Sequence, residues 1–301
     1  MYMNQPWSGE ISIASLEARE LLLSQFPELA PAEVEHFGEG FDNRVFLVND
    51  EYVFRFPRKA AAEELLKTES RILPELRIAA GVDYPVPVFS GKPDKGYPWF
   101  FSGYRKISGS APAGPGGTKS AIRLAEFLKQ HHSFPIERAE ELGVPYDTYN
   151  RLDMETRLVK MEEYAEKGKA AGILKEEESL FSYIKKARPI KVECDPVLVH
   201  GDLHIRNILA DPEGEISGII DWGDVHLGNP SIDLSIAYSY LRPDAREEFF
   251  GAYGEPGPEA RDLARFKGIY TALLLAVYAH DRGDAVLVGA ASDSLALALA
   301  D

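Results

Sequence analysis

The sequence contains a single cysteine, Cys194, among 301 residues, so no disulfide can form within the chain. A chain without disulfides is typical of a reducing compartment, and we expect this protein in the cytoplasm. Glu193, Asp195 and Pro196 surround the thiol, and none of them is a basic group that would lower its pKa. A catalytic thiol is therefore not expected here.

Long hydrophobic runs are also missing. The longest strongly apolar run, Ala272–Ala279, is far too short to cross a bilayer. The N-terminus lacks the basic segment and apolar core of a secretory signal. We therefore expect no association with a membrane.

Positive charge is scarce, because 33 Lys and Arg residues face 48 Asp and Glu residues, for a formal net charge of -15 at pH 7. This balance argues against a general nucleic-acid-binding protein, which presents a basic face. It fits a cationic small-molecule partner, although a soluble acidic protein has the same balance for other reasons. The length allows one large domain or two ordinary ones.

Polar side chains are concentrated between residues 197 and 233, where they follow two short apolar runs. His200-Gly201-Asp202 comes directly after Val197–Val199, and Asp221-Trp222-Gly223 comes directly after Ile216–Ile220. Asn207 lies five positions after Asp202. The pattern is H-x-D-x-x-x-x-N, a strand, and then D-x-G.

This order of side chains fits phosphoryl transfer, which needs a positioned acceptor hydroxyl, bound metal ions and cations near the phosphates. Asp202 is predicted to orient the acceptor hydroxyl or take its proton. Asn207 and Asp221 offer the hard oxygen ligands that Mg²⁺ prefers. The stretch therefore predicts a Mg²⁺-dependent phosphotransferase.

Three other interpretations of the stretch remain open. His200, Asp202 and His204 have the residue types of a zinc or iron hydrolase site. Asp202 and Asp221 would also suit the acid and base of a glycosidase. Finally, all these polar residues are common in ordinary turns. The hydrolase interpretation leaves Asn207 and Asp221-Trp222-Gly223 unexplained. The glycosidase interpretation does not explain the glycine-bearing turn or the pair of Arg55 and Glu69 upstream.

A glycine-bearing turn, Phe37–Arg44, is predicted to lead into a hairpin of strands Val45–Val48 and Glu51–Phe56. Gly38 and Gly40 would let backbone amides approach a phosphate. Neither a third glycine nor GKS or GKT follows, which excludes a Walker P-loop.

Arg55 lies in the second hairpin strand, and Glu69 lies in the helix predicted to follow it. Each alone is typical of a solvated position. Together with the upstream glycines, they predict a strand cation paired with a helix carboxylate beside nucleotide phosphates.

Further strands are predicted at Val86–Phe89 and Trp99–Ile107, before the composition changes to SGSAPAGPGGTKS. This change predicts a nucleotide-binding domain over residues 1–107 and a catalytic, acceptor-binding domain over residues 108–301. Helices dominate the second domain. They are expected from Ser120 onward and at the segments Leu152–Tyr164, Glu176–Ile184, Ile232–Leu241, Ala245–Tyr253, Leu263–His280 and Ala285–Ala300.

The motifs HGDLHIRNIL and GIIDWGD resemble those of the aminoglycoside and macrolide phosphotransferase family, whose fold is similar to that of protein kinases. The likeness extends from about Phe37 to Asp233. It implies an α+β, two-lobe fold with a small antiparallel-sheet lobe and a larger, mainly helical lobe. It also implies that Asp202 is the catalytic aspartate, that Asn207 and Asp221 bind Mg²⁺, and that Asp233 braces the catalytic loop.

On the nucleotide side, the resemblance assigns Gly38, Gly40 and Asn43 to the loop covering the nucleotide, and Glu69 to the helix glutamate. The hinge would be Tyr104–Ile107, which includes Lys106. Arg55 departs from the lysine of many relatives, and its flat guanidinium binds phosphate differently from an ammonium.

The resemblance implies ATP or GTP as donor and a small-molecule hydroxyl as acceptor, with an aminoglycoside or macrolide as the first expectation. Tyr104 would narrow the base pocket and favour guanine. A metabolic kinase of the homoserine, choline or thiosugar type is the alternative, and an inactive nucleotide-binding module is another. We expect a monomer. Carboxylates after Asp233, such as Asp244 and Glu247, would suit ammonium groups of an acceptor.

Overall fold

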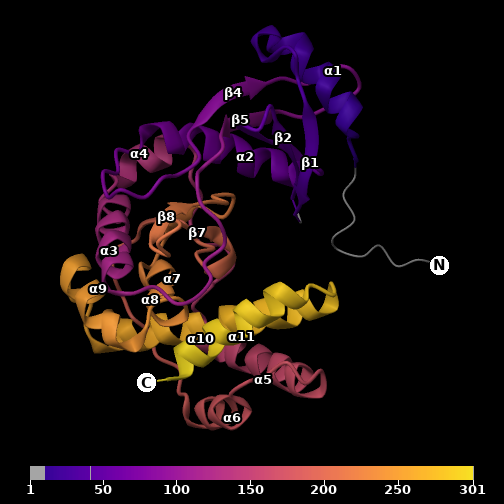
Figure 1. Ribbon diagram of the computed structural model, residues 1–301. Helices are drawn as coiled ribbons and strands as arrows, with labels where there is room; N and C mark the ends of the chain where they lie inside the picture. The colour runs from indigo at the N-terminus through magenta and orange to yellow at the C-terminus, as the bar shows by residue number, and fades with distance from the viewer. Residues whose placement is uncertain (1–10, 41, 301) are drawn as a thin grey trace. The chain divides into compact units, whose positions relative to one another are not determined.

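The computed structural model describes residues 11–40 and 42–300 (Figure 1). The chain divides into two compact units, one of residues up to 76 with 84–107, and the other of residues 77–83 with everything from 108. The segment 77–83, which we assigned to the first domain from the sequence, thus groups with the second unit. The reason is backbone pairing, because Asp83 N donates to Ser217 O at 2.8 Å and Asp83 O accepts from Ile219 N at 2.9 Å.

The first unit is built on a five-stranded antiparallel sheet in the order β1-β2-β3-β5-β4. Its strands are β1 (Val34–Glu39), β2 (Asn43–Val48), β3 (Tyr52–Pro57), β4 (Pro87–Gly91) and β5 (Phe101–Arg105). Its helices are α1 (Ser15–Gln25), which packs on β1, and α2 (Ala60–Ile72), which packs on β3 and β5.

The predicted hairpin is confirmed as β2 and β3. Asn49 and Asp50 form its turn with φ values of 54° and 58°, a left-handed conformation that asparagine and aspartate tolerate better than most residues. The alternation of β3 buries Phe54 and Phe56 in an aromatic core, where the ring of Phe56 stacks on Phe101 at 4.6 Å. The first unit also contains a strand that was missed: β1 (Val34–Glu39) takes up residues 37–39 of the predicted glycine turn.

The second unit is mainly helical. Its longer helices are α3 (Thr118–His132), α4 (Ile136–Glu141), α5 (Met154–Ala170), α6 (Glu177–Lys186), α9 (Arg246–Tyr253), α10 (Pro258–Asp281) and α11 (Ala285–Leu299). Two short antiparallel ribbons complete it, β6 (Val197–Val199) with β9 (His226–Gly228), and β7 (Ile208–Ala210) with β8 (Ile216–Ile219). Strands β7 and β9 and helix α4 were not predicted.

The segment predicted as one helix, Ile232–Leu241, forms two short helices instead, α7 (Ser231–Leu234) and α8 (Ile236–Ser239). Ser235, at the junction, donates its hydroxyl to Ile232 O at 2.7 Å. Such hydrogen bonds from serine to a preceding carbonyl compete with the regular helical pattern. The break places Asp233 on a short, fully buried turn.

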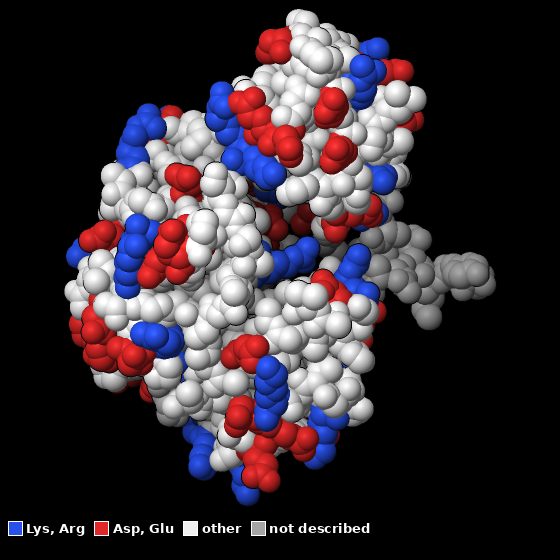
Figure 2. Space-filling view, in the orientation of Figure 1, with Lys and Arg blue, Asp and Glu red and all other residues white. Residues whose placement is uncertain are grey.

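Helix α10 is the central helix of the second unit, where it packs against α5, α7, α8 and α11. It begins with Pro258, which suits a first helical turn because the proline lacks an N–H. In the part of the chain that the structure describes, no helix combines the length and the apolar composition needed to span a bilayer. Charged side chains of both signs are interspersed over the face shown in Figure 2.

Candidate functional site

The loop that carries Asp202 is held from behind by Asp233. The carboxylate of Asp233 accepts hydrogen bonds from the backbone amides of His200, at 2.7 Å, and Gly201, at 3.0 Å. Both amides come directly after β6, so the carboxylate fixes the direction in which the chain leaves that strand. The predicted bracing role of Asp233 is confirmed.

His132 completes the buried environment of Asp233. Its Nε2 lies 3.2 Å from Asp233 Oδ2, and its Nδ1 lies 2.8 Å from the hydroxyl of Tyr253. Burial would raise the pKa of Asp233, but the hydrogen bond and charge of His132, with the nearby His200, hold it well below its usual range. The carboxylate is therefore ionised at neutral pH. His132 is therefore part of this hydrogen-bonded network.

Asp202 lies in the loop with its side chain 38% exposed. Asn207 Nδ2 donates to Asp202 O at 2.8 Å and lies 3.3 Å from Asp202 Oδ2, and His204 Nε2 lies 3.4 Å from the same oxygen. Burial tends to raise the pKa of Asp202, but His204, Lys267 and His200 together hold it below its usual range. Asp202 is thus an ionised carboxylate that can accept a hydrogen bond from a hydroxyl.

Asn207 and Asp221 lie at the same end of the β7–β8 ribbon. Ile220 N donates to Asn207 O at 3.0 Å, which ties the residue before Asp221 to Asn207. The side-chain amide nitrogen of Asn207 is engaged by Asp202, so its oxygen is the end of the group that can bind a cation. An amide oxygen and a carboxylate are a donor set that fits Mg²⁺.

Asp221 has a φ of 65°, a left-handed conformation that is uncommon for residues other than glycine. His200 supports the neighbouring peptide, because its Nε2 lies 3.1 Å from Ile220 O. Local strain of this kind at a polar residue is often found at functional sites.

Trp222 anchors the D-x-G turn by burial. Its side chain is fully buried, its Nε1 donates to Ile219 O at 3.2 Å, and its ring packs edge-on against His131 at 5.0 Å. Burial lowers the pKa of His131 to about 3. His131 is therefore a neutral packing residue.

The histidine-based hydrolase hypothesis receives no support. Among residues 11–40 and 42–300, no three His, Cys, Asp or Glu side chains are grouped to hold a metal ion. His200 instead bonds to backbone, since its Nδ1 accepts from Asp202 N at 3.3 Å and its Nε2 contacts Ile220 O.

In the first unit, Arg55 and Glu69 form the buried ion pair that we expected. Arg55 Nη1 donates to both carboxylate oxygens of Glu69, at 2.9 and 2.7 Å. The side chains are 8% and 2% exposed. The pair joins β3 to α2, and its role toward a nucleotide stays a prediction.

The residues predicted to cover the nucleotide lie at the ends of β1 and β2 and in the turn between them. Gly38 is in β1 and pairs with Val45 beside a register shift, and Gly40 N donates to Asn43 O at 2.9 Å. Asn43 is buried, and its side-chain oxygen has no hydrogen-bond partner among the described residues. Position 41 lies outside the described residues.

The predicted hinge residues follow one another along and beyond β5. Tyr104 is in the strand and pairs with Val53. Lys106 N donates to Glu51 O at 2.8 Å, and its ammonium lies 5.8 Å from the centre of the Phe37 ring. Ile107 is the last residue of the first unit.

Sequence reasoning missed a charged cluster near Asp202. Arg151 donates to Asp147 at 2.7 Å and to Asp224 at 2.6 Å. Burial and the charges of Asp202 and Asp221 raise the pKa of Asp224, while Arg151 opposes them. Lys267, on α10, belongs to the same electrostatic neighbourhood. No motif in the sequence marks these residues, because helices and loops far apart in the chain bring them together.

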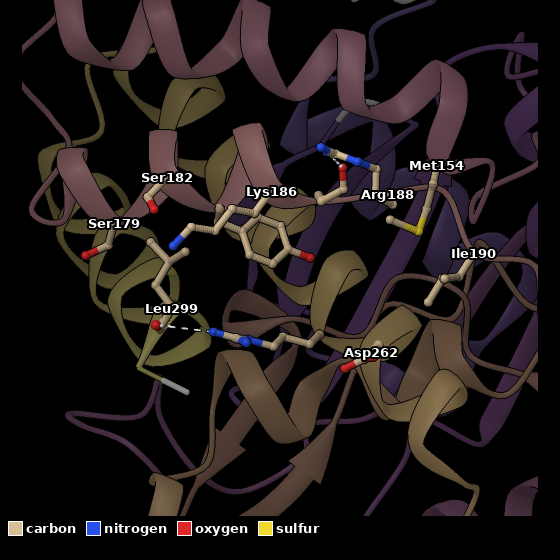
Figure 3. A pocket seen from close by; sticks show the side chains of 11 residues that line it. Met154, Ser179, Ser182, Lys186, Arg188, Ile190, Asp262 and Leu299 are labelled. Carbon is tan, nitrogen blue, oxygen red and sulfur yellow. Dashed lines mark hydrogen bonds between the residues drawn. The ribbon is translucent and has the colours of Figure 1, made fainter.

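Two cavities are lined by residues of the second unit, and Asp147 of the charged cluster lines one of them. One, of about 580 Å³, is lined by α6, α10 and the end of α11, including Tyr183, Lys186 and Asp262 (Figure 3). The other, of about 540 Å³, is lined by Asp153, Pro189 and their neighbours. No residue that we predicted to be catalytic, metal-binding or nucleotide-binding lines either cavity.

The fold is a kinase-like α+β fold. A small antiparallel sheet with its helix comes first in the chain, and a helical unit that carries the Asp202 loop and Asp221 follows. The chain belongs to the phosphotransferase enzyme family, whose family model matches residues 33–267.

Solved structures of similar chains include aminoglycoside and macrolide phosphotransferases. The GDP complex of wild-type aminoglycoside 2'-phosphotransferase-IIIa is 25% identical, with a TM-score of 0.66 over 96% of this chain and 99% of that one. The GDP and kanamycin complex of APH(2")-IIia is 26% identical, with a TM-score of 0.65 over 94% and 97%. Macrolide 2'-phosphotransferase MphH from Brachybacterium faecium is 21% identical, with a TM-score of 0.58 over 88% and 91%, and shows the likeness of fold alone.

Proposed function

We propose that this protein transfers the γ-phosphate of ATP or GTP to a hydroxyl group of a small molecule. The observation that carries the proposal is the arrangement around Asp202. Its carboxylate is ionised and partly exposed. Asn207 Nδ2 donates to the backbone carbonyl of Asp202 at 2.8 Å and to its carboxylate at 3.3 Å. Asn207 is in turn tied to the residue before Asp221.

In the proposed reaction, Asp202 accepts a hydrogen bond from the acceptor hydroxyl and takes its proton as the oxygen attacks the γ-phosphorus. The bond from the γ-phosphorus to the bridging oxygen of the β-phosphate breaks, and ADP or GDP leaves. Asn207 and Asp221 would hold Mg²⁺, which neutralises charge on the phosphate oxygens. Asp233 keeps Asp202 in position by fixing the preceding peptides. Arg55, oriented by Glu69, contributes positive charge toward the nucleotide phosphates.

For the acceptor, we propose an aminoglycoside or macrolide antibiotic. The support is the similarity, at 25–26% identity, to proteins named as aminoglycoside phosphotransferases, one of them solved with kanamycin. These structures contain GDP, and a streptomycin complex of a more distant neighbour contains ATP. We therefore test both ATP and GTP as phosphate donors. Tyr104 at the predicted hinge is our reason for expecting a preference for GTP.

A metabolic kinase for a sugar or amino alcohol is the second candidate. Lys267, whose charge acts on Asp202, favours it, because its ammonium would repel an acceptor with several ammonium groups.

The experiment is a mass-spectrometric screen of aminoglycosides, macrolides, homoserine, choline and thiosugars, each with ATP and with GTP. We expect a mass gain of one phosphate on one class. Nucleotide binding without transfer to any acceptor would favour the inactive module instead.

The same screen includes Asp202→Asn, with Asp281→Asn as a control on the exposed end of α10. Loss of a general base lowers turnover by roughly 100-fold or more. We expect that loss for the first variant, with nucleotide affinity retained, and wild-type turnover for the control. Near-normal turnover of Asp202→Asn would contradict the role of Asp202.

A further inference from the structure

Arg151 joins two carboxylates that come from separate segments of the second unit. Its side chain is 13% exposed. Its Nη1 donates to Asp147 Oδ1 at 2.7 Å, and its Nη2 donates to Asp224 Oδ1 at 2.6 Å. Two nitrogen atoms of one planar group thus bind two different partners, an arrangement that the compact ammonium of a lysine cannot reproduce. The guanidinium therefore fixes the spacing between these two segments.

The Asp147 end of this bridge is itself held in place. Asp147 N donates to Leu227 O at 3.0 Å, and Leu227 N donates to Pro145 O at 2.7 Å, so this segment runs beside β9. The carboxylate of Asp147 also accepts from the backbone amides of Tyr149, at 3.0 Å, and Arg151, at 2.8 Å. Burial would raise the pKa of Asp147, but hydrogen bonds from the backbone and side chain of Arg151 hold it below its ordinary value. One end of the bridge is therefore an ionised carboxylate anchored on β9.

The other end of the bridge lies in the turn that follows Asp221. Val225 N donates to Trp222 O at 3.2 Å, and this hydrogen bond closes the turn around Asp224. Within the part of the chain that the structure describes, Arg151 is the only cation at ion-pair distance from Asp224. Arg151 thus ties the turn that begins at Asp221 to the loop before α5.

The same turn packs directly against the loop that carries Asp202. Gly201 has a φ of 87°, and a Cβ atom added to it would overlap the carbonyl oxygen of Asp224. His226 Nδ1 lies 2.7 Å from that oxygen. Burial raises the pKa of Asp224, and the charges of Asp202 and Asp221 raise it further, as this proximity requires. Because no space separates Asp224 from the residue before Asp202, a shift of the turn would displace the loop.

We propose that Arg151 is a positioning residue whose bridge from Asp147 to Asp224 holds the Asp221 turn against the Asp202 loop. The proposed metal ligand and the proposed base then keep one fixed spacing. The inference rests on the proposed phosphotransferase function and adds to it a residue that acts through Asp224. Partners that orient the neighbours of a metal ligand commonly change metal affinity or activity by roughly 10- to 100-fold.

The test is calorimetric titration of ATP and of GTP, with and without Mg²⁺, into the wild type and Arg151→Met. We expect Mg²⁺ to strengthen nucleotide binding in the wild type, and Arg151→Met to lose roughly 10-fold in affinity only when the metal is present. The measurement does not depend on the identity of the acceptor. Unchanged affinity of Arg151→Met with Mg²⁺, or an equal loss without it, would overturn the proposal.

Arg261→Met is the matched control, because Arg261 also bridges two carboxylates, Glu247 at 2.6 Å and Glu255. Its side chain is 23% exposed. Urea denaturation measures what each variant loses in the free energy of unfolding. We expect the control to keep the wild-type dependence of nucleotide binding on Mg²⁺. If it lost that dependence as Arg151→Met does, the effect would follow from lowered stability, and the positioning role would be wrong.

A double-mutant cycle tests whether Arg151 acts through Asp224. Asp224→Ala breaks the same bridge, so we expect it to lower Mg²⁺-dependent nucleotide affinity as well. The double variant should then lose little more than either single variant, because contacting residues of one network do not add independently. Fully additive losses would show that Arg151 does not act through Asp224, which contradicts the proposal.

Arg151→Lys carries the test if Arg151→Met does not fold, as judged by its thermal unfolding. It keeps the charge but not the planar fork, so we expect a smaller loss of Mg²⁺-dependent affinity, about 3-fold. Wild-type affinity in Arg151→Lys would then count against the bridge.

Failure of the proposed function has its own outcomes. Mg²⁺-dependent nucleotide binding without phosphorylation of any acceptor in the screen would contradict the transfer reaction alone, since the effect of Arg151→Met on binding is still measured. Nucleotide binding in the wild type that does not depend on Mg²⁺ would overturn both the proposed function and this inference.

Discussion

Asp233 Oδ2 lies 2.7 Å from the backbone amide of His200, so a buried carboxylate on a short helix determines the start of the loop that carries Asp202. The same carboxylate also binds the amide of Gly201 and the ring of His132. Stability and activity are coupled at this point, because the contacts that keep the loop folded also position the proposed base.

Asp233→Asn is expected to destabilise the protein and to lower turnover together. An asparagine side chain has one oxygen, so it cannot accept from both amides and also bind His132. A broken buried network of this kind costs about 3–5 kcal/mol. Urea denaturation measures the loss, and steady-state kinetics measures the fall in kcat. A variant with wild-type stability would contradict the bracing role.

The stability of the protein is expected to fall as the pH drops from 6.5 toward 3, because of His131. Its folded-state pKa of about 3 is below its ordinary value of 6.5, so the unfolded chain binds a proton that the folded chain does not. The stabilisation is complete above pH 6.5 and is lost at up to about 1.4 kcal/mol per pH unit below it.

Urea denaturation at pH 7.5, 6.0 and 4.8 of the wild type and of His131→Leu tests this pH dependence. The variant should show a shallower dependence. The free energy of unfolding of His131→Leu should still fall somewhat as the pH drops, because burial also lowers the pKa of His226. Asp233 affects stability only at lower pH. Its contribution to the free energy of unfolding is lost only below the ordinary carboxyl pKa of 3.8. Equal slopes in the two proteins would argue against a neutral, buried His131.

The Arg55–Glu69 pair should show strong coupling in a double-mutant cycle. Removing one partner leaves a buried charge, so Arg55→Met and Glu69→Leu should each cost about 3–5 kcal/mol, and the double variant much less than the sum. Lys160 and Glu163, half-exposed at 3.0 Å, are the control pair, with an expected coupling below about 1 kcal/mol. Additive losses at Arg55 and Glu69 would rule out coupling.

Asp221→Asn should weaken Mg²⁺-dependent nucleotide binding while leaving the fold intact. Asparagine tolerates the φ of 65° at this position, but it lacks the charge that attracts the cation. Calorimetric titration of ATP with and without Mg²⁺ should show a loss of roughly 10-fold or more only when the metal is present. An equal loss without Mg²⁺ would point to a role other than metal binding.

Local patterns were enough to predict the β2–β3 hairpin, the strand β6 and most of the longer helices. Each depends on neighbouring residues, such as the Asn49-Asp50 turn or the apolar stripe of a helix. The missed β1 has six residues, whereas two of the missed strands are short, since β7 and β9 have three residues each. Strands of that length carry little periodicity and form only because a partner is supplied from elsewhere in the chain.

The sequence by itself was enough to indicate the family and to predict Asp202, Asn207 and Asp221 as site residues, because their chemistry is encoded within a short span of the chain. Only the tertiary structure decided the charge around them. Lys267, whose charge acts on Asp202, comes from α10, and Asp233 lies on the short helix α7. Coulomb interactions depend on distance in space rather than along the chain. The electrostatic field at Asp202 therefore depends on how the helices pack, which local sequence patterns do not predict.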